Sequence, residues 1–433
     1  MSLEPYSSRR EALLATIGDG VVFIPTAPER LRNRDSYHPY RFDSYFWYLT
    51  GFPEPGAALV LIGGRSHASP RSILFCREKD VEREIWDGFR YGPEAAREAF
   101  GFDEAHAFGK LEEKLPDLIA GHAALWYPFG QDARWDRRIA AALDAVRART
   151  RTGIRAPERI CDPRAPLDRM RLVKDAHEIE IMRRAAAIAS AGHLAAMRGC
   201  RPGMAEYELE AELAYEFRRR GASGHSFPPI VAGGENACVL HYASNDRMLA
   251  DGALVLIDAG CELDGYAADI TRTFPVGGRF SGPQREVYEI VLAAQAAAVA
   301  AIRPGAPFSA YHDAALRVLV RGLVDLGALT GEVDGLIESE AYQPFYMHRT
   351  GHWLGLDVHD AGEYRSGDEW AALAAGMTLT VEPGLYLRAR VPERLRGIGI
   401  RIEDDVLVTV DGARVYTDAP RTIDGIEEAM RHD

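Results

Sequence analysis

Hydrophobic and polar positions along the chain form blocks of two kinds, and these blocks predict two regions of mixed helix and strand. Short apolar runs bounded by Gly or Pro, at Gly20–Pro25 and Ala57–Gly63, are typical of buried strands. Three prolines within residues 157–166 punctuate a linker. We therefore predict a smaller N-terminal α/β domain over residues 1–165 and a second domain over residues 166–433.

In the second region the order of predicted elements repeats. An N-cap pattern, Asp175 with the acidic Glu178 three positions on, opens a helical pattern that runs to about Met197. A second amphipathic pattern runs from Met204 to Arg220, and strand-like segments follow these helices. Two further helical patterns, Ser281 to Ile302 and Ser309 to near Gly327, are again followed by strands. This order predicts an α+β domain in which helices cover a curved antiparallel sheet, with pseudo-twofold halves. The predicted strands are Pro229–Ala232, Ala237–Tyr242, Ala253–Asp258, Gly265–Pro275, Met377–Tyr386, Gly397–Val410 and Ala413–Tyr416.

Composition excludes several classes of protein. The net charge of −13 is spread along the chain, and no basic stripe that would bind nucleic acid is present. The five cysteines form no C-x-x-C pair, which suits a reducing compartment. We expect neither a signal peptide nor a membrane span, and therefore a cytoplasmic protein with no membrane partner.

A histidine cluster marks the first candidate site. His348, His352 and His359, three of the chain's 13 histidines, fall within twelve residues among glycines and apolar side chains. Histidine is the commonest side-chain metal ligand and titrates near neutral pH. The cluster alone leaves open whether it serves a metal, a nucleophile or a general base.

Four carboxylates favour a metal site over a nucleophile or a general base alone. Asp258, Asp269, Glu382 and Glu403 all stand within apolar strand patterns, where a charge is costly to bury unless it is paired or bound to metal. With one imidazole they form an oxygen-rich donor set that suits Mn²⁺, Co²⁺ or Zn²⁺. Four carboxylates exceed the charge of one divalent ion, so two ions are expected, as in two-metal sites that activate water.

These residues carry a resemblance to a known family. The set of Asp258, Asp269, His352, Glu382 and Glu403 is similar to the metal ligands of the pita-bread metallopeptidases, which include methionine aminopeptidase, prolidase and aminopeptidase P. The resemblance is greatest to bacterial aminopeptidase P. It implies a C-terminal pita-bread domain behind a creatinase/prolidase-like N-terminal domain that serves oligomerisation and access to the site. The matching motifs are Phe46–Phe52, Glu84–Trp86, Asn236–Tyr242, Asp258–Pro275, His348–Asp360, Val381–Tyr386 and Gly399–Asp405.

The resemblance also implies roles for the five ligands. Asp258 and Asp269 would bind one metal, and Asp269 and Glu403 would bridge the two metals. His352 and Glu382 would complete the second metal site, and Glu382 would also act as general base.

Further residues would contact the substrate or support the ligands. His241, His348 and His359 would line the pocket: His359 would stabilise the oxyanion, and His348 would contact the residue after the scissile bond. Arg401 would steady the ligand carboxylates. Trp86, supplied by a neighbouring subunit, would close the active site of a homo-oligomer, either a dimer or a tetramer.

The expected function is therefore that of a metal-dependent aminopeptidase. It would release the N-terminal residue from peptides whose second residue is proline, by attack of a metal-bridging hydroxide, with Mn²⁺ as the first choice of metal and Co²⁺ or Zn²⁺ as alternatives. A prolidase with the same site, which takes Xaa-Pro dipeptides, is one alternative. A metal-free binding protein or a creatinase-like enzyme on the same fold is another, although such relatives lack the ligand set.

Overall fold

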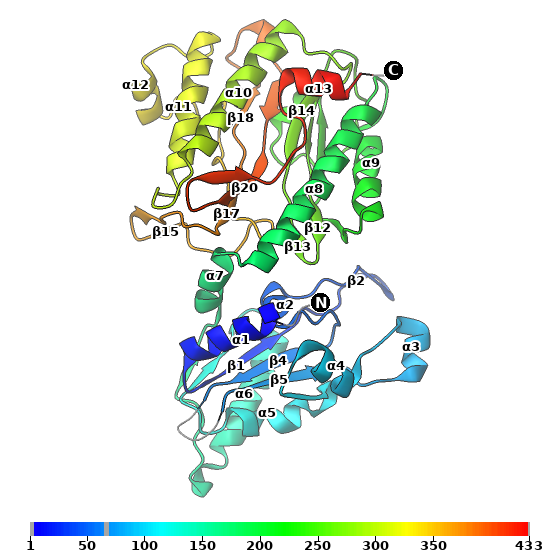
Figure 1. Ribbon diagram of the computed structural model, residues 1–433, viewed down its shortest axis with the longest axis vertical. Helices are drawn as coiled ribbons and strands as arrows, with labels where there is room; N and C mark the ends of the chain where they lie inside the picture. The colour runs from blue at the N-terminus through cyan, green and yellow to red at the C-terminus, as the bar shows by residue number, and fades with distance from the viewer. Residues whose placement is uncertain (1–3, 65–68, 432–433) are drawn as a thin grey trace. The chain divides into compact units, whose positions relative to one another are not determined.

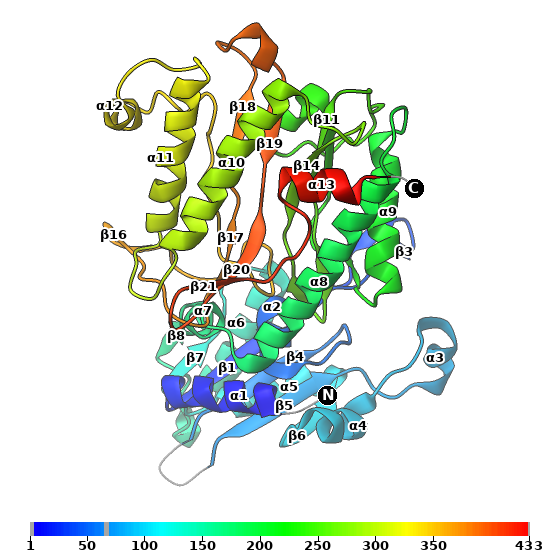
Figure 2. The same cartoon turned by 45° about the horizontal axis from the view of Figure 1, so that its top comes forward.

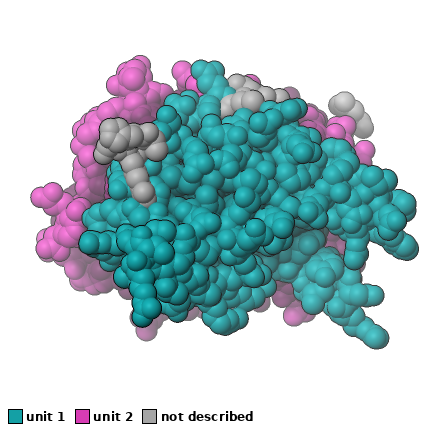
Figure 3. All heavy atoms as spheres, turned by 90° about the horizontal axis from the view of Figure 1, so that it is seen from below, with its two compact units in different colours: residues 1–168 teal, residues 169–433 magenta. Residues whose placement is uncertain are grey.

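The computed structural model describes residues 4–64 and 69–431. The chain forms two compact units, Met1–Asp168 and Arg169–Asp433, which Figure 3 shows in separate colours. We describe each unit by itself.

Unit 1 is built on a mixed six-stranded sheet with helices on both faces (Figure 1). Its strand order is β6-β5-β4-β1-β7-β8, in which β1–β4 and β4–β5 are antiparallel and the other pairs are parallel. The strands are β1 (Gly20–Pro25), β4 (Ala58–Ile62), β5 (Arg71–Cys76), β6 (Glu104–Ala107), β7 (Ala124–Trp126) and β8 (Arg159–Cys161). A separate small hairpin joins β2 (Leu31–Asn33) to β3 (Ser36–Tyr37).

Burial on both faces explains the continuous apolar runs of this sheet. Val21 and Phe23 pack into one core with side chains of α5 and α6, while the alternate residue Val22 is equally buried on the other face. The predicted strands at Gly20–Pro25 and Ala57–Gly63 are confirmed as β1 and β4. The helices are α1 (Glu4–Ile17), α2 (Ser44–Thr50), α3 (Val81–Asp87), α4 (Gly92–Phe100), α5 (Leu111–Ile119), α6 (Ala133–Arg147) and α7 (Arg164–Leu172), the last of which contains the boundary between the units.

Trp86 lies on α3, which Asp80 caps by accepting a hydrogen bond from the Arg83 N–H group. One local prediction in unit 1 was wrong. The segment read as a linker contains β8, an edge strand of the sheet. A three-residue strand between prolines is too short for its periodicity to be recognised.

Unit 2 consists of four long helices packed against a set of short antiparallel strands (Figure 2). The two halves repeat the predicted order, a helix pair followed by strands. The first long helix begins at the predicted capping box, in which Asp175 and Glu178 each accept a hydrogen bond from the other's backbone N–H. The helices are α8 (Ala176–Gly199), α9 (Glu206–Arg219), α10 (Gly282–Ala301), α11 (Ala310–Asp325), α12 (Val333–Glu338) and α13 (Ile423–Ala429).

The strands of unit 2 are shorter than predicted, because three long apolar patterns each break in the middle. Gly265–Pro275 divides into β13 (Tyr266–Ala267) and β14 (Thr271–Pro275), and the two parts pair in different sheets. Met377–Tyr386 and Gly397–Val410 divide in the same way. The remaining strands are β9 (Gly224–His225), β10 (Ile230–Gly233), β11 (Leu254–Asp258), β12 (Cys261–Leu263), β15 (Arg365–Ser366), β16 (Glu369–Trp370), β17 (Thr378–Val381), β18 (Gly384–Leu387), β19 (Ile398–Arg401), β20 (Asp404–Val408) and β21 (Ala413–Val415).

One predicted strand, Ala237–Tyr242, is absent from the described structure. A 3₁₀ turn at Gly234–Cys238 and a bend take its place. The cause is the buried carboxylate of Glu206, which accepts hydrogen bonds from the Gly233 N–H and the Tyr242 hydroxyl group. The backbone wraps around this carboxylate instead of extending.

All five cysteines are free, and four of them (Cys76, Cys200, Cys238 and Cys261) are buried. Within residues 4–64 and 69–431, no helix combines the length and the apolar character that a membrane crossing requires.

Candidate active site

The four carboxylates proposed from the sequence lie at strand ends and strand breaks rather than within strands. Asp258 is the last residue of β11, and Asp269 lies between β13 and β14. Glu382 directly follows β17, and Glu403 lies between β19 and β20. A side chain at a break is not bound to the alternating in-and-out geometry of a strand, so all four can turn toward one point. With His352 they form what we call the carboxylate–imidazole cluster.

Strand pairing brings distant parts of the chain together at this point. In the β11–β14 register, Asp258 is opposite Thr271. The Thr271 carbonyl accepts a hydrogen bond from the Glu403 N–H (3.0 Å), and the Thr271 hydroxyl donates to the Glu403 carboxylate (2.7 Å). Residues more than 130 positions apart are therefore fixed by backbone hydrogen bonds.

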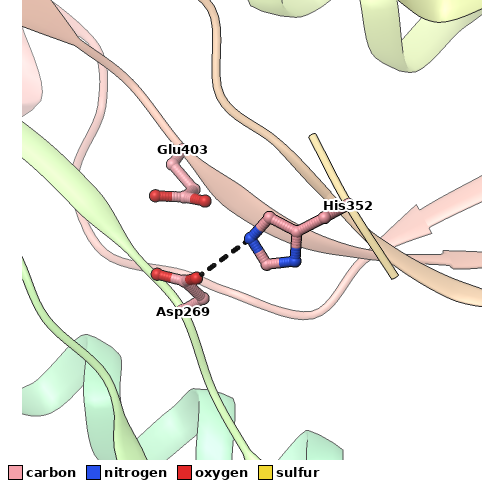
Figure 4. Close-up of side chains that lie close together, drawn as sticks. All are labelled: Asp269, His352 and Glu403. Carbon is pink, nitrogen blue, oxygen red and sulfur yellow. Dashed lines mark ion pairs between the residues drawn. The ribbon is translucent and has the colours of Figure 1, made fainter. Parts of the chain in front are cut away.

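The segment that carries His352 runs alongside β17. Thr380 donates its N–H to the His352 carbonyl (2.9 Å), and Glu382 donates its N–H to the Thr350 carbonyl (2.7 Å). The His352 Nδ1–H donates to the Trp353 carbonyl (2.9 Å), which leaves Nε2 facing the carboxylates. That nitrogen lies 3.4 Å from Asp269 and 3.9 Å from Glu382, and Figure 4 shows the imidazole directed at Asp269 and Glu403.

Electrostatics indicate that this site is built for cations. Burial, followed by repulsion from neighbouring carboxylates, raises the pKa of both Asp269 and Glu403 well above the usual range. Burial also raises the pKa of Glu382 to about 7, although His352 and Arg401 act against the shift. So many carboxyl groups in one buried place are unfavourable without positive charge between them.

The donor set passes a direct test of fit for metal. Ligand atoms of Asp269, His352 and Glu403 all lie within 4.8 Å of one another. The Oδ1 atoms of Asp258 and Asp269 are buried and have no hydrogen-bond partner among the described residues. Buried carboxylate oxygens without donors are what a hard or borderline divalent ion requires as ligands.

A chain of hydrogen bonds links the cluster to His348. Arg401 donates to Asp258 Oδ2 (2.6 Å) and to the Tyr386 hydroxyl oxygen (2.9 Å). That hydroxyl in turn donates to His348 Nε2 (2.8 Å), and His348 Nδ1–H donates to the Arg349 carbonyl (2.7 Å). Burial and then the Arg401 charge lower the pKa of His348 to about 3, so its ring is neutral with the proton on Nδ1.

The other predicted site residues, His359, His241 and Trp86, differ in burial and in their surroundings. The His359 ring centroid lies 4.3 Å from that of His352, and its pKa is lowered by desolvation and by that neighbour. His241 is exposed, and its proximity is a minor cause of the lowered pKa of both His348 and His359. Trp86 belongs to unit 1, on α3, with 83% of its surface exposed.

Sequence reasoning assigned no role to three residues that support the cluster: Thr271, Tyr386 and Asp405. Asp405 accepts the Asp269 N–H through both oxygens (3.2 and 3.3 Å), and burial raises its pKa well above the usual range. Its neighbour Asp404 has a lowered pKa because Arg272 and Arg421 offset its burial. Glu403, Asp404 and Asp405 are consecutive in the sequence, and that run alone does not distinguish a ligand from the residues that support it.

The sequence matches two family models. Metallopeptidase family M24 matches residues 180–410, and the N-terminal domain of aminopeptidase P matches residues 6–126. Among curated proteins, Xaa-Pro aminopeptidase of Escherichia coli is 45% identical, covering 100% of this chain and 99% of that protein. Human Xaa-Pro aminopeptidase 3 is 34% identical, covering 99% of this chain and 86% of that protein.

Solved structures give the same result. An aminopeptidase from Pseudomonas aeruginosa, PepP, has a TM-score of 0.97 at 49% identity, covering 99% of this chain and 98% of that chain. A Glu-to-Ala variant of Escherichia coli aminopeptidase P in complex with substrate has a TM-score of 0.96 at 45% identity, with the same coverage. The fold predicted for the second domain, helices over antiparallel strands in a pita-bread arrangement, is confirmed by these likenesses.

Proposed function

Because the chain belongs to metallopeptidase family M24 and is an Xaa-Pro aminopeptidase, we propose that its carboxylate–imidazole cluster holds two divalent metal ions and forms the catalytic centre. The observation that carries this proposal is the convergence of Asp269, His352 and Glu403 within 4.8 Å, with partnerless carboxylate oxygens beside them. Asp258 and Asp269 would hold one ion and His352 and Glu382 the other, with Asp269 and Glu403 serving both. When bound, such ions polarise a carbonyl group and lower the pKa of water.

Glu382 is the proposed general base. Burial raises the pKa of this carboxyl group in the metal-free chain to about 7, and a general base must lie within hydrogen-bond reach of the proton that it takes. It lies 3.9 Å from His352 Nε2 and 3.6 Å from His348 Nδ1, so it stands where the metal and substrate positions meet.

His348 and His359 are proposed to contact the substrate, with His241 at the rim. Since both nitrogens of His348 are engaged, its neutral ring offers a fixed surface to the residue after the scissile bond. His359 lies beside His352 without being needed as a ligand, and we assign it to stabilising the oxyanion. Arg401 holds Asp258 in place and, through Tyr386, fixes the tautomer of His348.

The proline requirement gives the direct test. The amide before proline has no N–H group and a fixed ring, so peptidases that bind an extended strand handle it poorly. We expect Xaa-Pro-Yaa to be cleaved well, and Xaa-Ala-Yaa and N-acetyl-Xaa-Pro-Yaa hardly at all. The dipeptide Xaa-Pro separates aminopeptidase from prolidase. Faster hydrolysis of the dipeptide would contradict the assignment, and ready cleavage of the alanine peptide would remove the proline claim.

Manganese is the proposed metal. The donor set has four carboxylates and one imidazole, an oxygen-rich composition that suits Mn²⁺ better than thiolate-seeking ions. A Zn-substituted form of the Escherichia coli enzyme has been solved, so zinc binds that relative. Protein purified without added metal should contain Mn²⁺ at close to two ions per chain by elemental analysis. Reconstitution in which Co²⁺ or Zn²⁺ gives higher activity than Mn²⁺ would oppose this choice.

We further propose a homo-oligomer in which α3 contacts a second copy. This helix has no buried residue, and it exposes large apolar side chains: Val81 at 69%, Ile85 at 80% and Trp86 at 83%. Exposed apolar side chains clustered on one short element are typical of interaction sites. Trp86→Ala should weaken substrate binding while metal content stays constant, and a fully active monomer in solution would refute the idea.

A cytoplasmic location is proposed from the five free cysteines, which suit a reducing compartment.

A further inference from the structure

A pocket of about 560 Å³ lies in unit 2, next to the segment that carries His348 and His352. One wall contains Thr350 and Gly351, which belong to that segment. The start of α11 forms a second wall with Tyr311, and the β15–β16 hairpin closes the third side with Arg365 and Trp370. This volume is enough for a side chain or a chain end of a peptide.

Two arginines give the pocket positive charge. The Arg365 guanidinium lies over the Trp370 ring, 3.7 Å from its centroid, and the Arg349 guanidinium lies 5.3 Å from the same centroid. Among the described residues, neither guanidinium has a carboxylate within 4.0 Å. Stacking on the indole fixes the plane of Arg365 while its N–H edges stay available, and these edges match the two oxygens of a carboxylate.

A buried hydroxyl adds a neutral donor. Tyr311 is 1% exposed, and its hydroxyl has no hydrogen-bond partner in the described structure. Burial raises its pKa well above the usual range, so the hydroxyl keeps its proton and can donate. Leaving such a group unpaired is costly, on the order of 1–3 kcal/mol, unless a ligand accepts the bond.

The N-terminus of α11 acts in the same direction. The helix begins at Ala310, and Ser309 before it also lines the pocket. The first turn of a helix has N–H groups without intrahelical partners and carries partial positive charge. The guanidinium pair, the tyrosine hydroxyl and the helix terminus all favour an anion.

We propose that this pocket is a substrate subsite that binds the terminal carboxylate of a short peptide beyond the cleaved bond. The inference rests on the proposed function, in which His348 contacts the residue after the scissile bond. Arg349 directly follows His348, and Thr350 both lines the pocket and binds Glu382 through its carbonyl. In this proposal the third residue of a peptide seated on His348 extends toward the pocket, and tripeptides with a free C-terminus are the preferred substrate class.

The experiment compares two substrates, Xaa-Pro-Yaa as the free acid and as the C-terminal amide, on the full-length metal-loaded enzyme. The wild type should cleave the acid with a KM roughly 10-fold lower than that for the amide, the size of one charge-assisted hydrogen bond. Arg365→Gln should remove this preference by raising the KM of the acid while kcat and the amide kinetics stay constant. Arg349 is left unchanged because it directly follows His348, which is proposed to contact the substrate.

Two further variants complete the design. Arg317→Gln, on α11 but 63% exposed and paired with Asp334 outside the pocket, is the matched control and should keep the preference. Tyr311→Phe removes only the unpaired hydroxyl, so it should fold as well as the wild type and raise the KM of the acid alone.

Equal cleavage of acid and amide by the wild type, or an acid preference that survives both Arg365→Gln and Tyr311→Phe, would overturn the subsite. A third result would also overturn the subsite. If a free N-acetyl amino acid inhibits amide cleavage by the wild type but not by Arg365→Gln, while the wild type shows no preference for the acid, the pocket binds an independent effector. Failure to cleave either peptide would instead count against the proposed function.

Discussion

Replacing Glu382 with Gln should change how the stability of the metal-free protein depends on pH. Burial among like charges raises the pKa of this carboxyl group from 4.5 to about 7 in the folded chain. A group whose pKa is raised by folding stabilises the protein fully below its unfolded pKa, and this contribution is lost as the pH rises through the folded pKa. The window for Glu382 is therefore about pH 4.5 to 7.

The magnitude follows from that shift. One pKa unit corresponds to about 1.36 kcal/mol, so integration between pH 5 and pH 8 gives a loss on the order of 2–3 kcal/mol in the free energy of unfolding. Asp269 and Glu403 act in the same direction because their pKa values are also raised. Glutamine cannot ionise, so the variant should lack the contribution of Glu382 and gain stability relative to the wild type as the pH rises.

The buried histidines also titrate, so the free energy of unfolding of the wild type must be subtracted from that of the variant. Burial lowers the pKa of His312 to about 4 and that of His348 to about 3. These groups lose stability as the pH falls below 6.5, the opposite direction to Glu382, and they do so in both proteins. The informative quantity is thus the difference in free energy of unfolding between Glu382→Gln and the wild type at each pH.

Guanidinium chloride unfolding of chelator-treated protein, followed by circular dichroism from pH 5 to pH 8, measures this difference. Glu338→Gln, an exposed glutamate on α12, is the matched control and should run parallel to the wild type. Parallel curves for Glu382→Gln and the wild type would refute the reasoning. Added Mn²⁺ should stabilise the wild type most at pH 8, because ligand carboxylates bind metal in their ionised form.

Three further outcomes test the site. Glu403→Ala should remove most activity and lower metal content in elemental analysis, while circular dichroism shows the fold retained; full activity would exclude it as a bridge. His359→Ala should keep its metals yet lose about 10²-fold in kcat, the scale of one oxyanion donor, and loss of metal would make it a ligand instead. Tyr386→Phe breaks the link between Arg401 and His348 and leaves buried polar atoms unpaired. It should therefore lower the free energy of unfolding, measured with denaturant, by on the order of 1–3 kcal/mol. Unchanged stability would show that water replaces the hydroxyl.

The sequence predicted those parts of the fold that depend on local chemistry. The capping box at Asp175 and the apolar runs of β1 and β4 were readable because their signals lie within a few residues. The breaks within Gly265–Pro275 and Met377–Tyr386 were not readable. The apolar pattern continues through each break, and only pairing with a different sheet interrupts the strand.

The residues of the candidate site also fall into those that the sequence indicated and those that it did not. Asp258 and Glu403 stood out as charges in apolar surroundings, which a single sequence displays directly. The support given by Thr271 and Asp405 did not stand out, because a buried threonine or a second aspartate is ordinary until its partner is known. The pocket beside Arg349 depends on three segments that meet only in the folded chain.

The positions of the five free cysteines allow local unfolding of the native protein to be followed by thiol labelling. Burial raises the pKa of Cys238 to about 11 and that of Cys76, Cys200 and Cys261 to about 12, so these thiols resist alkylation in the folded state. Only Cys161, on the edge strand β8, is partly exposed. A maleimide dye therefore labels unit 1 at one position without any engineered cysteine. Under mild denaturant, the order in which Cys76 and the three thiols of unit 2 become reactive then shows, by mass spectrometry, which unit opens first.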